Sequence, residues 1–124
     1  MSPNRWLLSC LVAALLTVTS ASWAQAPQQQ QYVVIYVVFL PDDANKGKKL
    51  LEDLATQTLK NRDVINFSAA RQIDRDNQFV LVERWKSAQA YQAYKASPTW
   101  TAFVAKAQPL LAAPLDERDG VLLR

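Results

Sequence analysis

Glu83, Trp85 and Tyr94 are the residues of this sequence best suited to act on or bind a small molecule. Glu83 and Trp85 are two positions apart in an apolar run, so on a β-strand their side chains lie on one face. If that face is buried, the pKa of the carboxyl group rises and the group can act as a general base. The indole offers a flat apolar surface, and the phenol of Tyr94 can donate one hydrogen bond. Together these groups suit a planar phenolic ligand.

Each of the three residues also has a structural interpretation that the sequence leaves open. Trp85 could pack the core where its strand meets the next helix, and Tyr94 could be a core aromatic with a satisfied hydroxyl. Glu83 could pair with an arginine such as Arg71, or face the solvent. We take Glu83 and Tyr94 as the candidate catalytic residues. The candidate substrate-binding residues, which line either a pocket or the core, are all aromatic: Trp85, Tyr36, Phe67, Tyr91, Trp100 and Phe103.

The composition excludes several kinds of chemistry. The 124 residues include no histidine, which excludes histidine-based acid–base catalysis, metal ligation by histidine and Ser-His-Asp triads. The 2 glycines are too few for a glycine-rich phosphate loop. We therefore expect no metal and no cofactor. The net charge of +3 arises from charges of mixed sign along the chain, which argues against a nucleic-acid partner.

Residues 1–24 have the layout of a secretory signal peptide. A basic start ends at Arg5, an apolar run covers residues 6–18, and small residues follow as far as Ala24. The run is shorter than the ~20 residues that a membrane span needs, so we expect no span after signal removal. Cleavage after Ala24, or after Ala26, would remove Cys10 and direct the protein to the periplasm or the exterior. An uncleaved anchor and a lipoprotein at Cys10 are the alternatives, and residues 25–31 are predicted to be a disordered linker.

Residues 32–40, YVVIYVVFL, form an uninterrupted apolar run of strand length. A strand with one solvated face would alternate apolar and polar residues, and this one does not. Both faces should therefore be covered, one by the helices of the chain and the other by a partner subunit. We assign Tyr36 to the ligand pocket, and we expect a charge at Val33, Ile35 or Val37 to prevent dimerisation or folding.

The rest of the chain completes one α+β domain over residues 32–124. A helix is predicted over 44–61, and two strands over 64–74 and 78–85 are joined by a tight turn at 75–77. A helix in two pieces covers 88–96 and continues from 98, a polar turn follows at 116–119, and the last strand is short, at 121–123. The order βαββαβ predicts a ferredoxin-like fold with a four-stranded antiparallel sheet and helices on one face.

The strand that ends in Glu-x-Trp and the helix after it resemble the antibiotic biosynthesis monooxygenase family of dimeric α+β barrels. The matching residues are Phe79 to Ser87 with Glu83 and Trp85, then Ala90-Tyr91, Tyr94 and Ser97-Pro98. The resemblance implies a homodimer held by sheet-on-sheet packing, with a pocket between each sheet and its helices. Tyr94 stands where the family most often has histidine, and the first strand lacks the asparagine of the haem-degrading members.

The resemblance implies oxygenation of phenols or quinols without metal or flavin, because the substrate anion itself supplies electrons to oxygen. Three functions are therefore compatible with the sequence. The first is an exported, cofactor-independent monooxygenase of small phenolic or quinol substrates. The others are a non-catalytic dimer that binds a small aromatic ligand, and a structural dimer module with a filled core.

Overall fold

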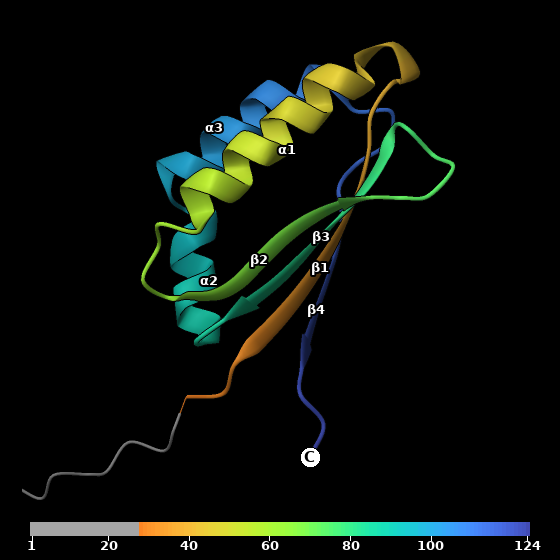
Figure 1. Cartoon of the computed structure of the whole chain (residues 1–124). Coiled ribbons are helices and arrows are strands. Elements are labelled where there is room, and N and C mark those ends of the chain that lie inside the picture. Colours follow the sequence, from red (N-terminus) through yellow and green to blue (C-terminus); the bar gives the residue numbers. More distant parts are fainter. Residues whose placement is uncertain (1–27) are drawn as a thin grey trace, which may run out of the picture.

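The computed structural model describes residues 28–124 and confirms the predicted fold class. Four antiparallel strands form one sheet in the order β2-β3-β1-β4. Figure 1 shows that the helices lie on one face of this sheet. Within residues 28–124, no helix or strand covers the other face. The strands are β1 (Gln31–Val38), β2 (Val64–Arg71), β3 (Gln78–Trp85) and β4 (Asp116–Val121). The helices are α1 (Ala44–Thr58), α2 (Ala88–Lys95) and α3 (Pro98–Ala107), with short 3-10 turns η1 (Pro41–Asp43) and η2 (Gln108–Leu110).

The predicted signal peptide, residues 1–24, lies outside the described residues, as does the start of the predicted linker. Residues 28–30 carry no regular secondary structure. Within the range that the structure describes, no helix combines the length and apolar character needed to cross a membrane.

β1 is a central strand, paired with β3 on one side and β4 on the other. Val33, Ile35 and Val37 are fully buried beneath the helices, whereas Tyr36 points to the uncovered face and is 38% exposed. The placement of Tyr36 in a pocket with Trp85 is therefore wrong. A charge at Val33 would disrupt the core of the chain itself and would not report on a contact between subunits. Because both faces of β1 are apolar, hydrophobicity alone does not show which face the helices cover.

β4 replaces the predicted polar turn at 116–119, and the predicted strand at 121–123 is wrong apart from its first residue. The strand is polar because it is an edge strand, whose side chains reach solvent on both faces. Its register with β1 places Glu117 opposite Ile35 and Asp119 opposite Val33, on the face that the helices cover. Asp116 and Arg118 point to the other face. This correction places two carboxylates, which the sequence assigned to a turn, on the helix-covered face of the sheet.

α1 packs on the sheet through Leu51, Leu54 and Thr58, which are almost completely buried. Gly47 in the first turns of this helix packs against the ring of Phe39, just after the end of β1. A Cβ atom at Gly47 would lie 2.2 Å from the ring of Phe39, so only glycine fits there without a shift. The missing side chain therefore sets how closely the first helical turns approach the end of β1.

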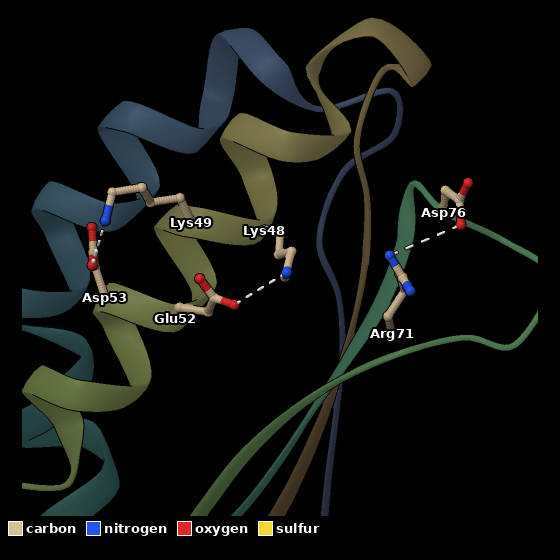
Figure 2. A network of polar contacts seen from close by, with 6 residues as sticks. All are labelled: Lys48, Lys49, Glu52, Asp53, Arg71 and Asp76. Carbon is tan, nitrogen blue, oxygen red and sulfur yellow. Dashed lines mark hydrogen bonds and ion pairs between the residues drawn. The ribbon is translucent and has the colours of Figure 1, made fainter.

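The exposed side of α1 carries the ion pairs expected from residues four apart. Lys48 lies 3.5 Å from Glu52, and Lys49 lies 3.4 Å from Asp53, as Figure 2 shows. All four side chains are more than half exposed, so each pair contributes at most a few tenths of a kcal/mol. These charges therefore form the solvated face of the helix.

α2 and α3 form the predicted two-piece helix. Ser87 caps α2, because its Oγ accepts a hydrogen bond from the backbone N–H of Ala90 at 3.0 Å. Pro98 begins α3 at the first helical position, where its missing N–H costs nothing. The short break between the helices lets α2 face the end of β3 while α3 packs beside α1, as Figure 1 shows.

Candidate functional site

Glu83 is the centre of the candidate site. Its side chain points from β3 toward the helices and is 1% exposed. Neither carboxylate oxygen has a hydrogen-bond partner within residues 28–124. The pairing with Arg71 considered from the sequence is wrong, because that arginine is exposed on the β2–β3 hairpin, 4.0 Å from Asp76 (Figure 2). Glu83 is thus a buried acid that no cation touches among the described residues.

The environment of Glu83 shifts its protonation toward neutral pH. Burial raises the pKa of the carboxyl group from 4.5 to about 7. The nearby indole N–H of Trp85 lowers this pKa, although the two groups do not reach hydrogen-bond geometry. The negative charge of Glu117 raises this pKa. The positive charge of Lys95 lowers it and the negative charge of Asp119 raises it, both by smaller amounts. A carboxyl group with this pKa can both take up and release a proton near neutral pH.

Trp85 ends β3 and is completely buried. Its ring lies 4.5 Å from that of Tyr94 and 5.8 Å from that of Tyr91, measured between centroids. The indole Nε1 has no acceptor in the described part of the chain. An unsatisfied donor and two unsatisfied acceptors, those of Glu83, therefore lie side by side in the interior. Nearly all buried polar groups have partners, so this combination requires an explanation.

The two tyrosines of α2 have their hydroxyls engaged. The Tyr94 hydroxyl lies 2.8 Å from that of Thr58 on α1, in a buried hydrogen bond. The Tyr91 hydroxyl donates to Glu117 on β4. Burial raises the pKa of both phenols above the ordinary value of 10, and the hydrogen bond to Glu117 raises that of Tyr91 further. Neither tyrosine is suited to act as a base at neutral pH, which leaves Glu83 as the base candidate.

The structure brings most of the sequence-predicted site residues together. The ring of Tyr94 contacts those of both Trp85 and Trp100. The ring centroids of Trp100 and Phe103 are 5.4 Å apart. Phe67 is buried on β2 directly opposite Glu83. Tyr36 alone lies on the opposite face of the sheet, where the guanidinium of Arg118 stands 5.4 Å from its ring centroid.

A charged rim borders this aromatic cluster at the side of β4, and the sequence analysis missed it. Lys95 donates to Glu117 and stands 4.7 Å above the ring of Trp100. The pKa of Glu117 is lowered because hydrogen bonds from Lys95 and Tyr91 outweigh the effect of its burial. Partial burial and the charge of Glu117 raise the pKa of Asp119. Residues 116–121 show no apolar–polar alternation that could have revealed this rim; the pairing with β1 is what places both carboxylates on one strand face.

Three hollows of the described surface lie away from Trp85 and Tyr94. One of about 310 Å³ lies between α1 and α3, with Phe103 in its wall. A second of about 320 Å³ lies on the uncovered face of the sheet, and a third of about 300 Å³ is lined by residues near both ends of the described chain. The rings of the aromatic cluster fill the space in which the sequence analysis placed a pocket. Among residues 28–124, no cluster of acidic side chains is arranged to hold a metal ion.

The fold and the site define a ferredoxin-like α+β protein with a buried glutamate and tryptophan at the end of its third strand. The family model described as antibiotic biosynthesis monooxygenase matches residues 22–106, which is more than half of the chain. The chain therefore belongs to the antibiotic biosynthesis monooxygenase family. No curated protein matches its sequence significantly.

Solved structures share the fold at low sequence identity. A candidate antibiotic biosynthesis monooxygenase from Nitrosomonas europaea is 17% identical with a TM-score of 0.73, over 77% of this chain and 92% of that one. A protein from Mycobacterium tuberculosis is 22% identical with a TM-score of 0.72, over 77% and 96%. Another candidate monooxygenase, from Caulobacter crescentus, is 17% identical with a TM-score of 0.72, over 79% and 93%. At these identities the similarity shows the fold alone.

Proposed function

We propose that the protein is a cofactor-independent monooxygenase of small phenols or quinols, with Glu83 as the general base. The observation that carries this proposal is the pair of neighbouring unsatisfied groups, the Glu83 carboxylate and the Trp85 indole N–H. A phenolic hydroxyl placed between them can donate to the carboxylate and accept from the indole. It would satisfy both groups at once, and no side chain in the described chain does so.

The reaction follows from these two contacts. Glu83 takes the phenolic proton, and the Trp85 N–H then stabilises the negative charge on the phenolate oxygen. The phenolate transfers one electron to dioxygen, and the resulting radical pair combines at an unsubstituted ring carbon. Glu83 returns its proton to the peroxide, and loss of water from this hydroperoxide leaves a quinone. One oxygen atom of dioxygen stays on the product and the other leaves in water.

The aromatic surroundings support this chemistry by excluding water. In an apolar site a phenolate loses its hydration shell and becomes a better electron donor. Because Glu83 is buried and the rings beside it are in contact, a substrate must displace part of the aromatic cluster in order to reach it. The partly exposed Lys95 and Glu117 mark the rim nearest to this cluster, so we place the entrance there, beside β4.

Oxygen consumption with a simple quinol tests the proposal. The rate should rise with pH around a midpoint near 7, where Glu83 ionises. Glu83→Gln should lower kcat by roughly 10²–10⁴-fold while binding of the quinol is retained. Glu52→Gln, on the exposed side of α1, is the matched control. Labelled dioxygen should leave one labelled atom in the product. A parent protein that consumes no oxygen above the uncatalysed rate would remove the enzyme proposal.

A second candidate function is a non-catalytic module that binds a small aromatic ligand. The complete burial of Trp85 and the 4.5 Å ring contact with Tyr94 leave the site closed in the free chain, which favours a function without catalysis, either as this binding module or as a structural one. Binding of a quinol that quenches Trp85 fluorescence, without oxygen consumption, would distinguish this function from catalysis. Absence of both binding and turnover would point to a structural dimer module.

We further propose that the uncovered sheet face packs against the same face of a second copy. Its centre is apolar, and large side chains such as Tyr36 and Val82 are 38% and 41% exposed. Val34→Asp should give a folded monomer, since Val34 points outward, whereas Val33→Asp should prevent folding. Sedimentation and circular dichroism separate the two outcomes. A parent protein that sediments as a monomer would contradict the dimer.

Export is the last part of the proposed function. The layout of residues 1–24 supports it, and mass spectrometry of the protein from a periplasmic fraction should find Gln25 at the N-terminus. Pro27 would indicate the alternative cleavage position. Recovery of the intact chain from the cytoplasm alone would contradict export.

A further inference from the structure

A separate hollow of about 320 Å³ lies on the uncovered face of the sheet, behind Glu83. Arg84 is at its centre, opposite Tyr32 on β1 and opposite Asn66 on β2. The register shift between Val64 and Asn66 leaves Ile65 without a partner on β3, and Ile65 completes the wall. The hollow thus has a cationic centre, polar neighbours on both sides and apolar walls.

Arg84 is a cation without a partner in the described chain. Among residues 28–124 its side chain takes part in no hydrogen bond or ion pair, and its Nε is buried with no acceptor. Arg118, the other arginine on this face, lies 2.8 Å from Asp116. Asp116 is the one carboxylate at the outward positions of the four described strands. The face therefore carries one positive charge that nothing on it neutralises.

We propose that this hollow binds a small carboxylate with an apolar body, and that the guanidinium of Arg84 pairs with the carboxylate. A guanidinium binds a carboxylate through two parallel N–H donors, which would also satisfy the buried Nε. The Asn66 amide and the Tyr32 hydroxyl lie in the same row and can donate to the same oxygens. Ile65 and Val82 offer apolar surface, and a molecule of the size of benzoate fits within the volume.

If the sheet face meets a second copy, the strands of that copy supply no free anion for Arg84. An identical chain presents the same outward residues, so it brings another unpaired Arg84 and no free carboxylate from these strands. Covering an unpaired guanidinium with apolar surface is costly. A bound carboxylate removes that cost in each subunit, so the ligand stabilises the face in the monomer and in the dimer alike.

Calorimetric titration of the purified protein with sodium benzoate tests the site, with benzamide as the neutral analogue. Benzoate should bind and benzamide should not. Arg84→Gln should weaken benzoate binding by roughly ten- to a hundred-fold, as expected for hydrogen bonds to a charged group. Arg84→Lys keeps the charge but loses the paired donors, so it should bind benzoate less tightly than the parent protein. Arg118→Gln is the matched control and should bind benzoate as the parent does.

Three results would overturn this proposal. They are equal benzoate binding by the parent and Arg84→Gln, no binding by the parent, and equal binding of benzamide. Circular dichroism shows whether Arg84→Gln is folded, and Arg84→Lys provides the comparison if it is not. Benzoate binding is measured without a quinol, so the site stands or falls independently of the proposed oxygenation.

Discussion

Replacing Glu83 by glutamine should stabilise the protein above neutral pH and have little effect in acid. The pKa of this carboxyl group is about 7 in the folded chain, against an ordinary value of 4.5. Below pH 4.5 both the folded and the unfolded chain carry the proton, so ionisation costs nothing. Between these two values the unfolded chain releases its proton first, so stability falls as the pH rises. Above about 7 the folded chain holds a buried charge, and the full cost is present.

The size of the effect follows from the two pKa values. The difference between 4.5 and about 7, at about 1.4 kcal/mol per pH unit, corresponds to roughly 3 kcal/mol. Glutamine has nearly the same shape and carries no charge, so the variant avoids this term. We expect the free energy of unfolding of Glu83→Gln to exceed that of the parent by up to roughly 3 kcal/mol at high pH, and the difference to vanish in acid.

Urea unfolding of both proteins across this pH range is the assay. The difference between parent and variant isolates Glu83, because Glu117 and Asp119 titrate in both. Protein concentration is held constant, since association would add to stability. Glu52→Gln, whose side chain is 61% exposed, should show no comparable pH-dependent gain. If Glu83→Gln is destabilised at high pH, or if the difference does not change with pH, the carboxylate is not an unpaired buried charge and the reasoning fails.

Three further predictions concern the packing around the site, and urea unfolding near neutral pH measures each. Tyr94→Phe removes the 2.8 Å bond to Thr58 and should cost about 0.5–1.5 kcal/mol, and an unchanged stability would show that the bond contributes nothing. Gly47→Ala places a methyl group 2.2 Å from the Phe39 ring and should cost about 1–3 kcal/mol of stability, and adding Phe39→Leu should recover part of this loss. If Gly47→Ala has no effect on stability, the helix shifts freely. Ser87→Ala removes the cap of α2 and should cost about 1 kcal/mol, and no loss would contradict its role as a cap.

The element order was predictable because each buried segment carries either an apolar run of strand length or a helical period. The bounds predicted for residues 78–85 agree with β3, whose burial alternates as expected for a strand. Leu51, Leu54 and Thr58 recur at helical spacing, and all three are buried. These patterns arise from burial within the chain, so the sequence records them directly. The end of α1 and the end of β2 were predicted a few residues too late, because polar residues at element ends carry little periodic signal.

The errors share a different cause, which is that they depend on contacts between distant segments. The polar residues 116–121 form a strand because β1 has a free edge, and nothing in their own composition indicates one. The two faces of β1 are equally apolar, so the sequence could not assign Tyr36 to the correct side. Whether Glu83 pairs with a cation depends on where the fold places the Arg71 side chain. In the structure that side chain is exposed on the β2–β3 hairpin.

The unsatisfied groups at Glu83 and Trp85 are easier to explain by a ligand than by folding. A glutamine or a leucine at position 83 would fill the same space without a buried charge, and the core would be more stable. The indole N–H of Trp85 is a second defect, and it lies beside the first. Two unrelated packing errors would have no reason to be neighbours, whereas one hydroxyl group can satisfy both. A hydroxyl bound between the two groups would also place its proton beside the carboxylate that must take it. Glu83→Gln therefore links the two measurements: the substitution that stabilises the fold at high pH is the one expected to abolish turnover.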